Sequence, residues 1–374
     1  MRIKTVNPQS AIRDLHSHMP AVTLAICGNP VSISARAPRL IRLFADYFRY
    51  YDPITLPFAE APARSPSAAA ENFPALSIEL KLCRELPLHD ALIPPTAELF
   101  SQTGVVSLWR EGQTTGREGE AKGRFYFHLG VAAFRVDVDA GQAIGLVTPQ
   151  ALEYPHILAN TYALFALLLL LRSRKLYHLH AAAILSPDEK LWLICGAQRA
   201  GKTTLTTALG LAGWRPVSDD SLLVGRDQDS AWLTPLRKYF HIGDELLHRW
   251  PELAGVTRHH QYLDRTCVGG LEFFKTRVLA ETRFRRIDHI VLPQIVNESR
   301  SRLEPLAKSE ALLRLAEQSM FFQLWRDHTA RQWQSLNELT ASAACHRLFS
   351  AADVLTEPHN AARVLSPTAK FMLS

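Results

Sequence analysis

The sequence predicts an α/β protein, α+β overall, with a β-rich N-terminal domain and a C-terminal domain in which strands alternate with helices. Short runs of alternating apolar and polar residues, separated by Gly-containing turns, recur through residues 1–154. One long helical pattern follows over residues 155–174. Beyond it, an apolar run enters a Gly-containing loop and a helical pattern leaves that loop. We therefore expect domains at 1–154 and 175–374, joined by a connector helix at 155–174.

The composition is that of a soluble globular protein. The chain has 374 residues, of which 47% are hydrophobic, enough to bury two cores. Its formal net charge of +6 comes mostly from Arg, which suits bidentate contacts to phosphate or carboxylate groups. There is no long Lys/Arg run and no aromatic-basic repeat, so the sequence argues against a nucleic-acid partner.

The cysteines and the apolar runs indicate a cytoplasmic protein. The five cysteines form no C-x-x-C pair, which favours reduced thiols. The first residues lack the apolar core of a signal peptide, and the longest apolar run, 163–171, is too short to span a bilayer. We expect no membrane partner, and the sequence leaves a homo-oligomer open.

The N-terminal elements are predicted from period-two alternation. A helical pattern lies at 40–50, and a segment rich in Pro, Ala and Ser at 57–74 predicts a surface loop or flexible connection. The predicted strands are 22–26, 75–82, 105–110, 124–129 and 132–138. No phosphate-binding motif occurs in this half, to which we assign acceptor recognition as a hypothesis.

The C-terminal half begins with a strand pattern at 177–184, a turn at 186–188 and an apolar strand at 191–195. After the loop and its helix, a further strand is expected at 214–218. The tail shows strand patterns at 287–296 and 345–349, with a helix-rich segment at 309–339 between them.

Residues 196–203 read Gly-Ala-Gln-Arg-Ala-Gly-Lys-Thr, the G-x-x-x-x-G-K-[ST] pattern of a phosphate-binding loop. Such a loop turns backbone N–H groups toward a phosphate chain at a helix N-terminus. Lys202 would reach the outer phosphates and Thr203 would offer its hydroxyl to Mg²⁺. The alternative is an accidental Gly-rich turn. The expected ATP-binding residues are Gly196, Ala197, Gln198, Arg199, Ala200, Gly201, Lys202, Thr203 and Thr204.

Two carboxylates follow the next strand pattern directly, at Asp219 and Asp220. We find no later apolar strand ending in Asp, of the kind that switch and motor NTPases use. If residues 219 and 220 are extended, their side chains point in opposite directions and hold different roles. We assign Asp219 as the general base and Asp220, with Thr203, as metal support. The alternative is that the pair only caps the turn before residues 221–224.

Histidines and cations near the loop are further candidates. His178 and His180 share a face if 177–184 is one strand, and His180 is a candidate catalytic residue beside the phosphates. The alternative is a strand histidine satisfied within the protein. Arg199, Arg237 and Lys238 could neutralise charge on the transferring group, or be ordinary surface charges.

Three motifs in order, His180-Ala181-Ala182-Ala183, the loop 196–203 and residues 213–220, resemble the catalytic half of HPr kinase/phosphorylase and its related kinases. The resemblance is strong over roughly 50 residues. It implies a nucleotide-binding fold of the phosphoenolpyruvate-carboxykinase type. It also implies that His180 lies by the phosphates, that Lys202 and Thr203 bind nucleotide and metal, and that the aspartate pair supplies base and metal support.

The sequence departs from HPr kinase itself. The loop interior 198–200 is bulkier than the family's Ser/Gly-rich form, and Gly269-Gly270-Leu271-Glu272 only faintly resembles its second Gly-rich signature. The N-terminal half does not match that enzyme. The resemblance therefore implies a related kinase, a group that includes kinases of peptide modification such as serine phosphorylation of lasso-peptide precursors.

We accordingly expect a phosphotransferase that uses ATP and Mg²⁺ to phosphorylate a hydroxyl, with serine of a peptide or protein as the favoured acceptor. Two alternatives stay open. One is a non-catalytic nucleotide-binding module that orders a partner. The other is a carboxykinase-like enzyme acting on a small carboxylate.

Overall fold

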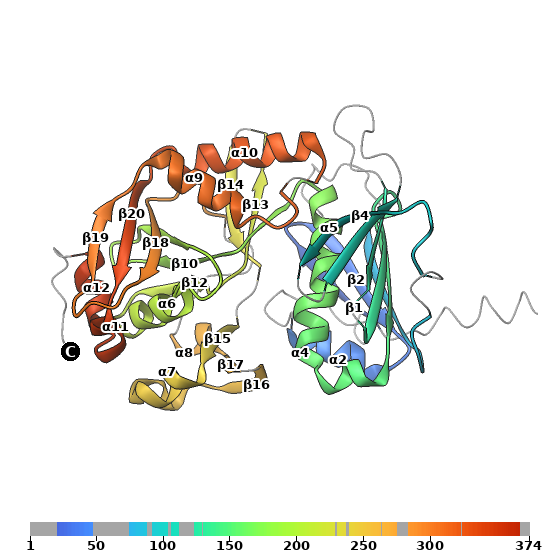
Figure 1. Ribbon diagram of the computed structural model, residues 1–374, viewed down its shortest axis with the longest axis horizontal. Helices are drawn as coiled ribbons and strands as arrows, with labels where there is room; N and C mark the ends of the chain where they lie inside the picture. The colour runs from blue at the N-terminus through green and yellow to red at the C-terminus, as the bar shows by residue number, and fades with distance from the viewer. Residues whose placement is uncertain are drawn as a thin grey trace, which may run out of the picture. The chain divides into compact units, whose positions relative to one another are not determined.

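The computed structural model describes residues 21–47, 75–87, 92–103, 106–111, 123–128, 130–228, 230–236, 239–262, 264–274, 283–322 and 324–366. Its fold is mixed α/β (Figure 1). The chain forms two compact units that divide between Leu170 and Leu171, inside the segment expected to connect two domains. Within the described ranges, no helix combines the length and apolarity needed to cross a membrane.

The first unit is built on a mostly antiparallel sheet, eight-stranded over the described residues, in the order β1-β2-β3-β8-β7-β6-β5-β4. Strands β2, β3 and β8 run parallel to one another. Helix α2 (Pro38–Tyr47) follows β2. The strands are β1 (Ala21–Ile26), β2 (Asn29–Ala35), β3 (Leu76–Leu82), β4 (Glu98–Thr103), β5 (Val106–Glu111), β6 (Arg124–His128), β7 (Ala132–Asp137) and β8 (Gln142–Val147).

All five strands predicted for this half are confirmed, and the predicted helix is present at 38–47. Strands β2, β4 and β8 were not predicted. In β2 the burial alternates with period two, but Asn29 and Pro30 at its start are typical of a turn. The Pro/Ala/Ser-rich segment 57–74 lies outside the described residues.

The helical segment predicted at 155–174 is confirmed but is not one regular α-helix. It comprises α4 (Pro155–Ile157), a π-helical stretch η2 (Leu158–Ala163) and α5 (Leu164–Ser173). A 3₁₀ turn, η1 (Pro149–Glu153), precedes it. The helical spacing of apolar residues does not reveal such a change of pitch, because a π turn shifts the apolar face by only one residue.

Over its described residues, the second unit contains a six-stranded sheet in the order β12-β10-β11-β18-β20-β19, in which β11, β18 and β20 are parallel. Two smaller sheets have the orders β14-β13-β9 and β15-β17-β16. The strands are β9 (Tyr177–Leu179), β10 (Ala181–Leu185), β11 (Leu191–Cys195), β12 (Arg215–Ser218), β13 (Leu222–Arg226), β14 (Ala231–Pro235), β15 (Phe240–Gly243), β16 (Arg258–Tyr262), β17 (Arg265–Val268), β18 (His289–Ile295), β19 (Arg302–Pro305) and β20 (Ala344–Ser350).

Helices cover both faces of the six-stranded sheet. Along β11, Leu193 and Cys195 join the core beneath α9 and α10, whereas Trp192 and Ile194 join the core with α6 and α12. This alternation explains why the whole strand is buried. The helices are α6 (Lys202–Leu211), α7 (Asp244–Arg249), α8 (Gly270–Phe273), α9 (Lys308–Glu317), α10 (Arg326–Thr340), α11 (Ala352–Thr356) and α12 (His359–Leu365), with a 3₁₀ turn η3 (Pro251–Gly255).

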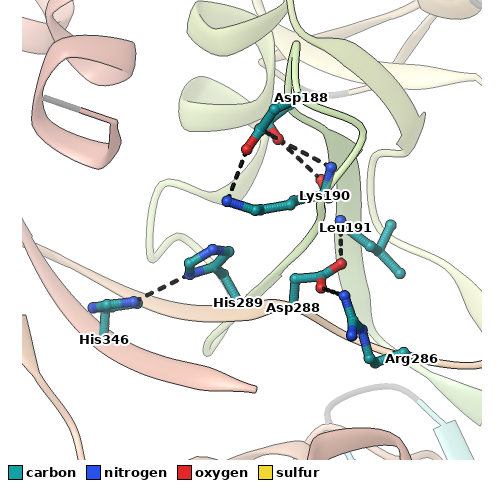
Figure 2. Close-up of polar contacts among 8 residues, drawn as sticks. Asp188, Lys190, Leu191, Arg286, Asp288, His289 and His346 are labelled. Carbon is teal, nitrogen blue, oxygen red and sulfur yellow. Dashed lines mark hydrogen bonds and ion pairs between the residues drawn. The ribbon is translucent and has the colours of Figure 1, made fainter. Parts of the chain in front are cut away.

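The strand that leads to the loop is fastened at its start. The Asp288 carboxylate accepts a 3.0 Å hydrogen bond from the Leu191 N–H and pairs with Arg286 (Figure 2). The next residue, His289, stacks on Trp192 with ring centroids 3.8 Å apart. These contacts fix the register of β11 against β18. They thereby fix where the loop begins relative to the end of β18.

Candidate functional site

The loop at 196–201 leaves the carboxyl end of β11 and turns directly into α6. Two of its residues adopt positive φ, Arg199 at 67° and Gly201 at 91°. Left-handed positions within a loop turn successive backbone N–H groups to one side, which forms an anion-binding concavity. Gly201 is the N-cap of α6, so the free N–H groups of the first helical turn face the same place. The geometry is that expected of a phosphate cradle.

The side chain of Lys202 is folded back on this loop. Its Nζ donates hydrogen bonds to the carbonyl oxygens of Gly196, at 2.7 Å, and Ala197, at 3.1 Å. The residue is buried, and burial lowers the pKa of Lys202 below its ordinary value, while Asp220 and Asp219 act in the opposite direction. The oxygens that hold this cation thus belong to its own loop.

The aspartate pair lies on a bend after β12, not on extended backbone as expected. The bend is fixed by Ser218, whose hydroxyl donates to the Ser221 carbonyl at 2.8 Å and accepts from the Ser221 N–H. Because of this turn, the two carboxylates do not point to opposite sides. The expectation of opposite directions was wrong, since a bend removes the two-residue periodicity on which it rested.

One oxygen of Asp219, one oxygen of Asp220 and one ring nitrogen of His241 lie within 4.8 Å of one another. Asp219 is 1% exposed and accepts a 3.0 Å hydrogen bond from the His241 N–H, whereas Asp220 is partly exposed. His241, on β15, was missed from the sequence. Its only signal there was a polar residue inside a short apolar run, which is too common to single out.

The two strand histidines approach the same bend from another direction. The strand predicted at 177–184 is interrupted at His180, so β9 pairs with β13 and β10 with β11 and β12. His178 lies on β9 and its Nε2 is 2.9 Å from the Ser221 hydroxyl. His180 lies between the strands, with Nδ1 2.9 Å from the Asp220 carbonyl oxygen. The prediction of one continuous strand was therefore wrong, and both histidines contact residues 220–221.

The other candidate residues are more exposed or lie farther along the chain. Thr203 and Thr204 are partly exposed in the first turn of α6, and Arg199 is exposed in the loop. Arg265, on β17, was not predicted, yet its charge lowers the pKa of Lys202 and so lies within electrostatic reach of that amine. Arg237, Lys238 and the side chain of Glu272 lie outside the described residues.

A cavity of about 530 Å³ adjoins the first half of the loop. The loop residues 196–200 form one wall, and the end of β18 and one face of α9 form others. The described site therefore has two parts: the carboxylate bend following β12, and this cavity beside β18.

Comparison with known proteins adds no family assignment. No protein-family model matches the sequence, and no curated protein matches it significantly. The loop, the aspartate bend and the residues around them therefore carry the functional assignment.

Proposed function

We propose that this chain is an ATP- and Mg²⁺-dependent phosphotransferase, a kinase that transfers the γ-phosphoryl group to a hydroxyl in the cytoplasm, with serine of a peptide or protein as the favoured acceptor. The observation that carries the proposal is the convergence of the phosphate loop, the buried Lys202 and the Asp219-Asp220 bend within one unit. The order of these motifs supports a nucleotide-binding domain of the HPr-kinase type.

The loop would bind the phosphates through its backbone. A triphosphate seated on N–H groups of the loop and of the first turn of α6 offers oxygens that compete for the Lys202 amine with the carbonyls of Gly196 and Ala197. Phosphate oxygens are charged and these carbonyls are not, so charge favours the exchange. Lys202 would then neutralise charge on the outer phosphates as the group transfers.

The donor set beside the loop fits a divalent cation. Carboxylate oxygens and the hydroxyl of Thr203 are ligands that Mg²⁺ accepts, and the His241 imidazole adds a donor that suits Mn²⁺ better. Asp220, with Thr203, would hold the ion. When bound, the cation would shield the charge of the phosphates. Side chains of the protein would accept the proton and orient the acceptor.

Asp219 would act as the general base. Its carboxylate is oriented by the His241 N–H and enclosed by protein, so its position is fixed before an acceptor arrives. The hydroxyl proton would pass to this carboxylate as the acceptor oxygen bonds to the γ-phosphorus and the bond to ADP breaks. His180, held by the Asp220 carbonyl, would fix the bend that carries both aspartates.

Transfer of label from γ-labelled ATP to a library of serine peptides, with MgCl₂, tests the proposal. We expect transfer by the wild type and a loss of about 100- to 10,000-fold in Asp219→Asn. Asp188→Asn is the matched control, because Asp188 is an exposed aspartate in the turn before β11. Full transfer by Asp219→Asn would remove Asp219 as the base.

The alternative of a non-catalytic nucleotide-binding module predicts a different pattern. The near-complete burial of Asp219 favours it, since a carboxylate with 1% exposure is not open to an acceptor without some rearrangement. In that case ATP binds, Lys202→Ala abolishes binding, and no acceptor is ever labelled.

A further inference from the structure

The cavity beside the loop holds a set of groups that the phosphate cradle and the aspartate bend do not use. Its 530 Å³ lies within the range of small-molecule sites in proteins. Pro293 and Ile295, at the end of β18, contribute its apolar surface. The amide side chains of Gln198, Gln294 and Gln318 also line it.

The position of the cavity relative to the aspartates follows from the strand order. Asp219 and Asp220 follow β12, two strands from β11 on one side, whereas the cavity lies against β18 and β20 on the other side. In phosphoryl transfer the attacking oxygen and the leaving oxygen lie roughly in line across the phosphorus. If the acceptor reacts beside Asp219, ADP must extend away from Asp219, toward the β18 side.

We propose that this cavity is the nucleoside subsite, which receives the base and ribose of ATP. The inference rests on the proposed function, and it assigns a ligand to residues outside the phosphate loop.

The walls of the cavity carry one arginine more than they carry carboxylates. Arg347 pairs with Glu310, and Arg314 pairs with Glu317 at 2.8 Å, so the charges of α9 and β20 facing the cavity are largely balanced. The remaining cation, Arg199, belongs to the loop, where the phosphates of ATP would lie, so the walls away from the loop suit an uncharged ligand better than a peptide with several acidic residues. A nucleoside instead needs apolar surface for the base, amide groups for its polar edge and carboxylate oxygens for the ribose hydroxyls.

The exposure of Ile295 is the strongest single observation in favour of a nucleoside subsite. Its side chain is 64% exposed at the rim of the cavity, among the most exposed large apolar residues of the described chain. It also lies over the loop's turn into α6, because a Cβ added at Gly201 would come within 3.7 Å of it. A base stacked on Ile295 would cover this surface while its phosphates rest on the loop.

Calorimetric titration with MgATP and with Mg-tripolyphosphate separates the nucleoside from the phosphates. We expect the wild type to bind ATP at least about tenfold more tightly than tripolyphosphate. Ile295→Asn removes apolar surface without adding charge, so it should weaken ATP binding about tenfold and leave tripolyphosphate binding unchanged. The matched control is Leu313→Asn, since Leu313 is 52% exposed on α9 and does not line the cavity.

The outcomes distinguish the two proposals. Equal affinity of wild type and Ile295→Asn for ATP would overturn the nucleoside subsite while leaving the phosphate cradle standing. An increase in the KM for the acceptor peptide in Ile295→Asn, with unchanged ATP affinity, would show that the cavity holds the acceptor and would also overturn it. Binding of neither ligand by the wild type would overturn the proposed function itself.

Discussion

Two buried cations of the second unit, Arg172 and Lys202, have hydrogen-bond partners of different kinds. Arg172 is 1% exposed on α5, and its guanidinium donates to the Leu324 carbonyl at 2.9 Å and to the Gln332 side chain at 2.7 Å. A further donor bonds the Phe322 carbonyl at 3.0 Å. Lys202 is 7% exposed and bonds two carbonyls of its own loop.

The partners of the two cations differ in what could replace them. The oxygens around Arg172 come from residues about 150 positions away in sequence, so this guanidinium ties the start of the second unit to the chain after α9. The carbonyls around Lys202 are five and six residues upstream, beside a concavity open to an anion. Arg172 is held by partners that are distant in sequence and thereby stabilises the fold. Under the proposed function, the phosphates of ATP replace the carbonyl partners of Lys202.

The largest effect on stability should come from Arg172. Arg172→Met would leave the Leu324 and Phe322 carbonyls and the Gln332 side chain without their donor, at a cost of about 3 kcal/mol. Urea unfolding measures this against Arg363→Met, which removes an exposed arginine paired with Glu357. Equal unfolding midpoints for both variants would show that Arg172 does not hold this region together.

The surroundings of Arg172 should also make the unit sensitive to acid. Burial, aided by Arg172, lowers the pKa of His328 to about 4 from its ordinary 6.5. Above pH 6.5 the histidine is neutral in both states; between pH 6.5 and 4 only the unfolded chain binds the proton. As pH falls from 6.5 to 4, the free energy of unfolding should therefore decrease by up to about 3 kcal/mol, and below pH 4 it should level off.

The pH dependence is measured from unfolding free energies between about pH 7.5 and 4 for wild type and His328→Gln, a range set by that pKa. We expect the unfolding free energy of the variant to depend less steeply on pH than that of the wild type. The same dependence in both proteins would mean that groups other than His328 produce it.

The loop around Lys202 depends on backbone conformation. Gly201→Ala places a side chain at φ 91°, which should cost about 1–2 kcal/mol and displace the N–H groups of the cradle. Gly243→Ala is the matched control, because Gly243 has φ −60° and open space around its added Cβ. ATP affinity should fall in the first variant only. Wild-type stability and wild-type ATP affinity in Gly201→Ala would show that the cradle does not require this left-handed position.

The smallest effect should have the opposite sign to that of Arg172→Met. Burial lowers the pKa of Lys202, so the charged amine destabilises the fold at every pH below its folded pKa. Water can replace the amine at the carbonyls of Gly196 and Ala197, because these two residues are partly or fully exposed. Lys202→Met should therefore be more stable than wild type at about pH 7, and the difference should disappear as pH rises toward 10.5. Thermal unfolding at about pH 7 and 10 checks this, and a stability loss at neutral pH would give Lys202 the structural role of Arg172.

Much of this architecture could be predicted because it depends on local pattern. The apolar run 191–195, the loop and α6 follow from strand alternation, the Gly positions and helical spacing, and all three are confirmed. The break at His180 and the bend at Asp219 could not be predicted, since both depend on pairing with β13 and on the Ser218-Ser221 hydrogen bonds. His241 reaches the aspartates through the sheet β15-β17-β16, a long-range arrangement without a sequence signal.

The proposed function requires Lys202 to exchange its loop carbonyls for the phosphates of a nucleotide, and calorimetric titration with MgATP measures the affinity that depends on this exchange. The comparison is between wild type, Lys202→Ala and Lys190→Ala, the last removing an exposed lysine that pairs with Asp188 before β11. We predict saturable binding by the wild type and by Lys190→Ala, and a loss of about 100-fold or more in Lys202→Ala. Equal ATP affinity in all three proteins would contradict this role of Lys202.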